Sequence, residues 1–366
     1  MTTAQAAPAR AATAGKNSLY EQWIATTGAP VYRDYYIEDL RTLKLGRWDA
    51  RDCDAAFLNL VGAEGLTATY VTEIRPGATI TPFKMAVDEA VYVVDGRGLA
   101  TISGDGGSKT FEWNKHSMFL VPANYTYQLS NAQGNQAARL LHFNFLSSAM
   151  VVLPNLDFFF NNPITDRGRL AQDFYSEAKS VSGEESLRGV GKVWIGNFFP
   201  DLRAWDNLDP YRGRGAGGTA VFIEFPASPV TAHMSVFPSR TYKKGHRHGP
   251  GVSIVIPTGE GYSIMWPEGG EKVIVPWHEA SFFIPPNRWF HQHFNVSGEW
   301  NRYLAFHGPR IFAGTERIVN TSADQIEYPS EEPFIRQKFE EELGKRGLTS
   351  LMVDEAYKDP NYQWKY

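Results

Sequence analysis

Short apolar runs of about strand length recur along the chain, separated by clusters of turn residues. The runs are rich in β-branched and aromatic side chains, and they form one series over 68–145 and a second over 219–307. Runs of this kind, bounded by glycine, proline, asparagine and aspartate, are typical of antiparallel strands. We therefore predict an all-β protein with two sets of strands.

The second series repeats the first in a constant register, which indicates an internal duplication. One offset aligns four pairs of residues without a gap: Phe83 with His246, Glu89 with Val252, Gly96 with Gly259, and Gly98 with Gly261. A shift of one residue beyond that turn aligns three more pairs: Pro122 with Pro286, Tyr127 with His291, and Asn131 with Asn295. We expect each series to form its own domain.

The sequence divides into five parts. The start, 1–18, is rich in small residues and lacks the apolar stretch of a secretory signal, so we interpret it as a disordered leader. The strand series give an N-terminal domain over 19–150 and a C-terminal domain over 216–320. Between them, 151–215 has fewer strand-like runs and is expected to be a partly helical connector. The last part, 321–366, holds a helix and a tail.

Two segments outside the strand series have helical patterns. Within the connector, 166–179 is compatible with a helix. Near the C-terminus, 330–347 has a capping residue, a proline in the first turn, an apolar stripe and a terminating glycine. These are Ser330, Pro333, the stripe Ile335, Phe339 and Leu343, and Gly347. We expect this second helix to pack on a sheet or on a second subunit rather than to take part in catalysis.

Composition supports many packed strands and excludes several classes of partner. Aromatic residues make up 14% of the chain, with 33 glycines and 22 prolines, which suits strands joined by tight turns. The formal net charge of -4 offers no sustained positive field for nucleic acid or anionic lipid. No apolar run approaches the roughly 18 residues that would span a membrane. The single cysteine, Cys53, excludes an intramolecular disulfide and fits the cytoplasm.

Histidines are concentrated in the second series of strands. Side chains two residues apart lie on the same face of a strand, so His246 and His248 can contact one ion. A third ligand must come from a strand that is remote in sequence, and His291 and His293 are both available on one face there. An isolated pair is more often a surface or core feature. The second histidine strand makes a divalent metal site the better interpretation.

The spacing of these residues resembles the two motifs of the cupin superfamily. The second half is similar to those motifs at six positions: His246, His248, Gly259, Pro286, His291 and Asn295. It departs at three, because Arg240 and Arg288 replace turn glycines and Val252 replaces a glutamate ligand. The resemblance implies two cupin domains, each a double-stranded β-helix or jelly roll, with a metal site in the second.

The resemblance also implies that the first domain has lost its ligands. Phe83, Met85 and Tyr127 occupy the histidine positions, and Glu89 alone cannot hold a transition ion. We interpret this domain as a metal-free structural partner. Its three replaced positions either fill the core or line a small apolar cavity.

Among cupins, the second half resembles the ring-cleaving gentisate and salicylate dioxygenases, which share an HRH pair, a small or apolar residue in place of the glutamate, and an HxHxN run. This implies Fe(II) held by His246, His248 and His291, with His293 beside it as an acid/base or as a hydrogen-bond donor to bound oxygen. The strand pattern alone does not separate His291 from His293 as the third ligand. Those enzymes usually carry the metal in the first cupin, whereas here it is expected in the second.

Three neutral ligands leave the charge of a divalent ion uncompensated, so an anionic chelating substrate and dioxygen can bind side by side. We predict an Fe(II) dioxygenase for a small aromatic or enolic, oxygen-rich substrate. Two alternatives stay open: a non-redox decarboxylase, isomerase or hydrolase that uses Mn, Ni or Zn, and a non-catalytic small-molecule-binding bicupin. The resemblance to bicupins also implies a homodimer.

Four residues are candidates for the substrate pocket. Arg288 and Trp289, next to the ligand strand, could bind a carboxylate and stack on a ring. His233 lies at a strand position that could line the barrel mouth, although a hydrogen-bonded core histidine is the simpler interpretation. Met265 and Trp266 alternate faces of one strand, so one of them borders the pocket, and we include Trp266 as the candidate.

Overall fold

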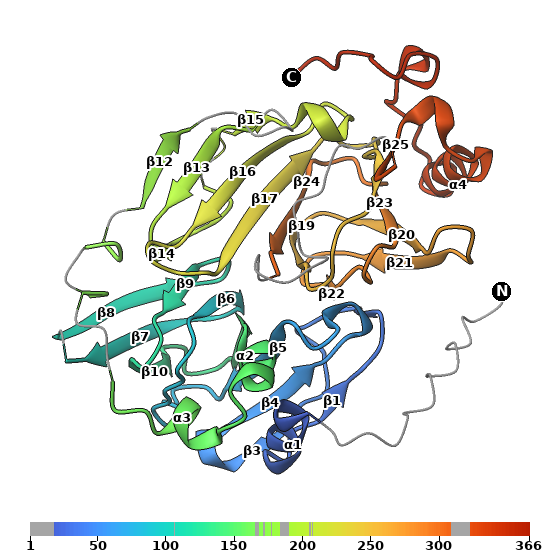
Figure 1. The fold of residues 1–366 in the computed structure, drawn as a ribbon. Coiled ribbons are helices and arrows are strands. Elements are labelled where there is room, and N and C mark those ends of the chain that lie inside the picture. The colour runs from blue at the N-terminus through green and yellow to red at the C-terminus, as the bar shows by residue number, and fades with distance from the viewer. Residues whose placement is uncertain are drawn as a thin grey trace.

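The computed structural model describes residues 18–308 and 323–366, except 106, 165–167, 171–172, 177, 184–189, 205 and 207. Within these residues strands predominate, as predicted, and the helices are short (Figure 1). The helices are α1 (Leu19–Thr26), α2 (Leu146–Val152), α3 (Leu156–Phe160) and α4 (Pro333–Gly344). None of the helices in this part of the chain is both long and apolar enough to cross a membrane.

The N-terminal half forms two sheets. The larger has the order β1-β4-β5-β11-β6-β9-β14, with β3 alongside β4, and the smaller has the order β10-β7-β8. The strands are β1 (Val31–Tyr32), β3 (Gly46–Trp48), β4 (Cys53–Leu58), β5 (Ala68–Ile74), β6 (Glu89–Asp95), β7 (Arg97–Gly104), β8 (Gly107–Asn114), β9 (Met118–Val121), β10 (Thr126–Asn131), β11 (Ala138–Asn144) and β14 (Phe198–Phe199). Antiparallel pairing dominates, as the alternating pattern predicts.

The C-terminal half repeats this plan. Its larger sheet has the order β12-β13-β16-β17-β24-β19-β22-β2, with β15 alongside β16, and its smaller sheet has the order β21-β20-β23-β18-β25. The larger sheet contains β2 (Tyr36–Ile37), β12 (Lys179–Ser182), β13 (Lys192–Ile195), β15 (Asp209–Pro210), β16 (Thr219–Glu224), β17 (Thr231–Phe237), β19 (Ser253–Thr258), β22 (Phe282–Phe283) and β24 (Asn301–Phe306). The smaller contains β18 (Gly245–His246), β20 (Gly261–Trp266), β21 (Val273–Trp277), β23 (Phe290–Asn295) and β25 (Gln325–Ile326).

One short strand crosses from the N-terminal half to the C-terminal sheet. β2 pairs with β22, while β14, from the connector, pairs with β9 of the N-terminal sheet. The large sheets also share an apolar core, in which the rings of Phe143 and Phe306 stack with centroids 4.9 Å apart. Apolar burial between the sheets and these strand pairings hold the halves together.

Equivalent residues of the two halves make equivalent contacts, which confirms the internal register. The side-chain amides of Asn131 and Asn295 each donate hydrogen bonds to carbonyls of the loops beside their strands. A Cβ atom added to Gly98 would lie 1.9 Å from a backbone oxygen of the neighbouring strand, and one added to Gly261 would lie 2.0 Å from the corresponding oxygen. Both glycines therefore allow the same close approach of two strands.

Two turns keep their shape although arginine replaces glycine. Arg240 has a φ of 57° and Arg288 a φ of 60°, both in the left-handed region. Their counterparts in the first half, Gly77 and Asn124, have φ values of 66° and 64°. The motif departures therefore leave the loop paths unchanged, at a backbone cost of roughly 1 kcal/mol for each arginine.

The C-terminal helix is confirmed, with a different cap and an earlier end, because α4 ends at Gly344 and not at Gly347. α4 buries the predicted stripe of Ile335, Phe339 and Leu343. Its N-cap is Glu332, and Ser330 lies in a preceding 3-10 turn, because Pro333 fixes the first turn of the helix. At the other end of the chain the predicted leader lies outside the described residues except for Ser18, which caps α1.

The prediction of a helix over 166–179 is wrong for the described part of that segment. Residues 168–170 and 174–176 form turns, and the segment ends where β12 begins. Leu170 and Tyr175 pack into the core of the N-terminal half, and the Tyr175 hydroxyl donates to a β9 carbonyl at 2.7 Å. Tertiary packing of these two side chains outweighs the local helical preference.

Candidate metal centre

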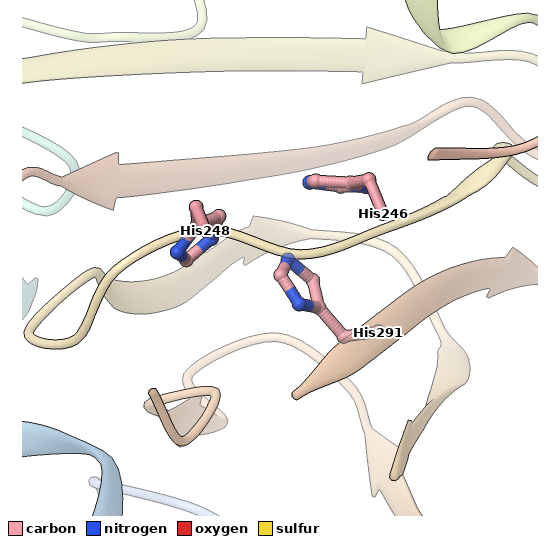
Figure 2. Close-up of side chains that lie close together, drawn as sticks. All are labelled: His246, His248 and His291. Atoms are coloured by element: carbon pink, nitrogen blue, oxygen red, sulfur yellow. The ribbon is translucent and has the colours of Figure 1, made fainter. Parts of the chain in front are cut away.

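His246, His248 and His291 converge on one point in the C-terminal barrel. His246 ends β18 and lies directly opposite His291 on the antiparallel strand β23, while His248 follows in the loop after β18. The ring centroids of His246 and His291 are 4.2 Å apart, and those of His248 and His291 are 4.5 Å apart. One nitrogen of each ring lies within 4.8 Å of the others (Figure 2).

Backbone carbonyls orient the three rings. The Nδ1 atoms of His246, His248 and His291 contact the carbonyl oxygens of Lys244 at 3.4 Å, Gly249 at 2.7 Å and Trp289 at 3.2 Å, respectively. A carbonyl can only accept, so each contact places the ring proton on Nδ1 and leaves the Nε2 lone pair for another partner. Partners of this kind fix the tautomer and ring plane of metal-binding histidines.

The site favours neutral imidazoles. His291 is buried, and burial, with the nearby His248 and His293, holds its pKa well below the ordinary value. A divalent ion needs deprotonated nitrogen ligands, so the suppressed protonation and the ring geometry both fit a first-row transition metal. Val252, where the cupin motif has a glutamate ligand, packs against an apolar cluster and provides no oxygen.

His293 lies beside the triad but outside it. Its ring centroid is 5.6 Å from that of His291, and its Nδ1 atom is 2.8 Å from the Ser263 hydroxyl, which also accepts a hydrogen bond from the Trp277 indole at 3.0 Å. The structure thus separates the two histidines of this strand: His291 joins His246 and His248, and His293 is held by a serine.

Two buried cations flank the histidines, and sequence reasoning missed both. Lys243 is fully buried, donates to the Ser235 hydroxyl and lies 3.4 Å from the Tyr303 hydroxyl, whose ring is 5.1 Å from that of His293. Burial first, and then the charge of Lys243, hold the pKa of His293 well below its ordinary value. Arg214 is 1% exposed, and its charge also lowers the pKa of His291 and the pKa of His293.

The predicted pocket residues Arg288 and Trp289 make different contacts. The Arg288 guanidinium pairs with Asp324, and its backbone N–H donates to the His248 carbonyl at 3.0 Å. The Trp289 ring packs on Tyr35 with centroids 5.6 Å apart and against the apolar cluster that contains Met265. Both residues support the histidines through their backbones, and a role of either side chain in substrate binding stays a prediction.

The face assigned to Trp266 is wrong. In the pairing of β20 with β23, Met265 lies opposite His291, and Trp266 lies opposite Phe290. Directly opposite residues share a face of the sheet, so Met265 is on the side of the histidines. Trp266 is on the other side of the sheet, where it stacks on Phe290 in the apolar cluster that packs against α4.

His233 forms a histidine pair at a distance from the triad. Its Nδ1 atom is 2.8 Å from Nε2 of His307, and the Nδ1 atom of His307 is 3.2 Å from the Thr231 hydroxyl. The His233 ring is 5.6 Å from the ring of Tyr303, which separates it from His293. The hydrogen-bonded core interpretation therefore describes His233 better than direct lining of the metal site.

The N-terminal barrel contains a buried carboxylate with four hydrogen bonds, at the position of the glutamate ligand in the cupin motif. The Glu89 carboxylate accepts from the hydroxyls of Tyr70 at 2.6 Å and Tyr127 at 2.8 Å, from Nδ1 of His142 at 2.9 Å, and from the Asn144 amide at 2.9 Å. Burial alone would raise the pKa of Glu89, but His142 and the two hydroxyls hold it below the ordinary value. Tyr127 therefore has a polar role that its position in an aromatic cluster did not suggest.

No family model and no curated protein matches the sequence. Solved structures match by fold. One is a mutant of oxalate decarboxylase from Bacillus subtilis, with a TM-score of 0.50 and 11% identity over 77% of this chain and 79% of that chain. A second is the same enzyme at pH 4.6, with a TM-score of 0.49 and 12% identity over 76% of this chain and 77% of that chain. A third is a structure of this enzyme from work on its Mn(II) centres, with a TM-score of 0.49 and 12% identity over 77% of this chain and 79% of that chain. The likeness shows the fold, that of a bicupin, and confirms the predicted fold class.

Proposed function

We propose that this bicupin is a metal-dependent enzyme whose C-terminal barrel binds one divalent first-row ion through His246, His248 and His291 and acts on a small organic anion. The observation that carries the proposal is the convergence of three imidazole nitrogens within 4.8 Å of one another, each ring held by a carbonyl. The bound ion would supply Lewis-acid polarisation of an oxygen ligand.

The charges around the histidines support an anionic substrate. All three ligands are neutral, so they leave the charge of a divalent ion uncompensated. Lys243 and Arg214 add two buried positive charges that lie close enough to lower the pKa of His293. A carboxylate that binds here would meet the divalent ion and two cationic side chains in a site of low dielectric, where each attraction is stronger than in water.

The residues beside the triad favour non-redox chemistry, with decarboxylation as the reaction type. Loss of carbon dioxide from a carboxylate breaks a carbon–carbon bond and leaves an electron pair on carbon, which must take up a proton. Lys243, Tyr303 and His293 form a group of proton-bearing side chains next to the triad. One fold neighbour is an oxalate decarboxylase, and Mn(II), Ni(II) and Zn(II) are the candidate metals for this reaction.

An Fe(II) dioxygenase is the second candidate. The observation that favours it is the absence of a carboxylate among the ligands, with Val252 at the glutamate position. Three neutral ligands leave room and charge for an anionic chelator and dioxygen together. The substrate would then be a small aromatic or enolic, oxygen-rich anion, as the resemblance to ring-cleaving cupins implies.

Reconstitution with metal followed by paired assays tests the proposal. Purified protein is stripped, loaded separately with Mn(II) or Fe(II), and assayed on a panel of small carboxylates and hydroxylated aromatic acids with and without dioxygen. We expect about one metal per chain in the wild type and much less in His248→Ala, because two imidazoles hold such an ion far more weakly than three. Turnover without dioxygen supports the decarboxylase, and turnover only with dioxygen supports the second candidate. Failure to bind either metal contradicts both.

The anionic substrate class has its own test. Lys243→Met should weaken binding of an oxalate probe to the metal-loaded protein by about tenfold or more while metal uptake stays intact, because a buried cation is lost. Lys244→Met is the matched control, since the neighbouring Lys244 pairs with Glu327 instead. Equal loss in both variants would show that the effect is structural. A homodimer and a cytoplasmic location stay predictions from the sequence.

A further inference from the structure

Arg51 is a buried cation in the N-terminal barrel with part of its hydrogen-bonding capacity unused. It is 1% exposed and ends the 3-10 turn Asp49–Arg51. Its guanidinium carbon lies 4.2 Å from the ring centroid of Phe83, 5.1 Å from that of Tyr127 and 5.5 Å from that of Trp48. Aromatic rings thus cover the guanidinium, and only its edges remain for hydrogen bonds.

One edge of the Arg51 guanidinium donates a hydrogen bond, and the other edge has no acceptor among the described residues. Nη1 donates to the Tyr127 hydroxyl at 3.2 Å. Nε and Nη2 are buried and have no acceptor among the residues that the structure describes. These two atoms form the side-on edge that binds a carboxylate through two parallel hydrogen bonds. Arg41 uses the same two atoms on the Asp39 carboxylate elsewhere in this protein.

The nearby acid does not complete the site. Glu89 already accepts from four donors, two on each carboxylate oxygen, and none of them is Arg51. The Tyr127 hydroxyl lies between the guanidinium and that carboxylate. Arg51 makes none of the ion pairs found among the described residues. Leaving buried donors unpaired costs about 1–3 kcal/mol for each group, so a partner for this edge is strongly favoured.

The duplication gives Arg51 a counterpart at the metal centre. The offset that aligns Phe83 with His246 also aligns Arg51 with Arg214, and both arginines end a 3-10 turn. Their carbonyls accept equivalent backbone hydrogen bonds, from Thr81 at 3.0 Å and from Lys244 at 2.9 Å. Each half therefore places a buried arginine at the same point of its barrel, whether or not it has kept the histidines.

We propose that the metal-free N-terminal barrel binds a small monocarboxylate through the Nε and Nη2 edge of Arg51, against the aromatic surface of Phe83, Tyr127 and Trp48. The ligand is a short-chain carboxylate because the surrounding side chains are apolar and bulky. Phe83 is only partly buried, so this aromatic surface reaches the protein exterior at that residue. The site needs no metal and is independent of the proposed reaction in the other barrel.

Calorimetric titration of His248→Ala protein with acetate and propionate tests this site, because this variant keeps the N-terminal barrel and lacks one of the three proposed metal ligands. We expect saturable binding that raises the melting temperature, since a ligand that binds only the folded state stabilises it. Arg51→Lys, which keeps the charge without the two-atom edge, should bind at least about tenfold more weakly. Arg75→Met, at an exposed arginine of the same half, should bind as the parent does.

Three results would overturn the proposal: no saturable binding to the parent, affinity unchanged in Arg51→Lys or Arg51→Met, or a crystal structure grown with acetate that shows only water on Nε and Nη2. The crystal structure needs no variant, so the test stands even if the Arg51 variants do not fold. Metal uptake by the wild type is measured separately. Loss of anion binding and failure of the proposed catalytic function are therefore distinguishable.

Discussion

Glu89 and Val252 occupy the same position in the two halves. The half with Glu89 lacks the three histidines, and the half with Val252 has them. Glu89 collects four hydrogen bonds in a barrel whose other ligand positions are aromatic or aliphatic. Val252 packs against apolar side chains in the barrel that has the three histidines. A carboxylate that is fully occupied by protein donors cannot also bind an ion, so Glu89, at the position of the glutamate ligand in the cupin motif, stabilises the fold of the first half instead.

Replacing Glu89 by glutamine should destabilise the protein by about 3 kcal/mol, because hydrogen bonds to a charged acceptor are lost and an amide group must find new partners in a buried site. Chemical denaturation gives the change. Glu73→Gln is the control, because that carboxylate is partly exposed and pairs mainly with Arg139. The folded-state pKa of Glu89 is lowered, so its contribution is present above the unfolded value and is lost as the pH falls. A variant as stable as the wild type would contradict the role given to this cluster.

The resemblance to the cupin motifs predicted the three histidines, whereas strand alternation alone left His291 and His293 undecided, and His248 lies in the loop after β18. The sequence did not reveal Lys243 or Arg214, since a charged residue in a strand-and-turn pattern is normally exposed and nothing local indicates that a barrel will enclose it. The choice of Trp266 over Met265 was wrong for a related reason. Alternation shows that the two residues lie on opposite faces, but only the register with β23 shows which face carries the histidines.

The need for glycine where β20 and β23 approach closely can be tested at Gly261. Gly261→Ala should destabilise the protein by more than about 3 kcal/mol or prevent folding, because the new methyl would lie 2.0 Å from a backbone oxygen of β23, which cannot move without opening the sheet that positions His291. Thermal unfolding measures the effect. Gly298→Ala, where the added methyl meets nothing within 4 Å, should change little. Equal effects of both substitutions would show that the close approach of the two strands is not the reason why position 261 requires glycine.

Glu331, just before α4, predicts how the stability of the protein depends on pH. Burial raises the pKa of the Glu331 carboxyl to about 7, and the carboxyl is contacted by the Tyr242 hydroxyl and the Gln292 amide. Because the folded-state pKa is raised, the associated stability is fully present below the unfolded pKa of Glu331 and is lost as the pH rises through about 7. Glu331→Gln should therefore be more stable than the wild type at about pH 8, by at most about 3 kcal/mol, and less pH-sensitive.

Urea denaturation of both proteins at about pH 5 and about pH 8 checks this prediction. Glu332→Gln is a suitable control, because the neighbouring Glu332 is an exposed carboxylate paired with Lys272. A wild type whose stability does not fall between the two pH values would show that Glu331 titrates as an exposed acid does.

Strands were easier to predict than the segments that connect them. The alternating runs of the two series correspond to β5 to β11 and to β16 to β24, because a half-buried strand needs that pattern. The connector was mispredicted at 166–179, where the contacts of Leu170 and Tyr175 with a distant core determine the conformation. Two-residue strands such as β2 carry too few residues for any periodicity, and only the folded chain reveals them.

Metal binding should stabilise the whole molecule. An ion at 1,000 times its dissociation constant stabilises the folded state by about 4 kcal/mol, because the unfolded chain does not gather the three histidines. We expect Mn(II) to raise the melting temperature of the wild type and a chelator to reverse the change. His248→Ala should not respond, and His278→Ala, which changes an exposed histidine outside the triad, should respond as the wild type does. A response that survives in His248→Ala would place the ion elsewhere.

The pairing of β2 with β22 restricts how this gene can evolve. If the N-terminal half were deleted, β22 would keep β19 on one side but lose β2 on the other, and the exposed edge would be prone to aggregate. Selection against aggregation would therefore retain the N-terminal half even if it contributed nothing to turnover. A half that is retained for this reason can acquire a new binding specificity.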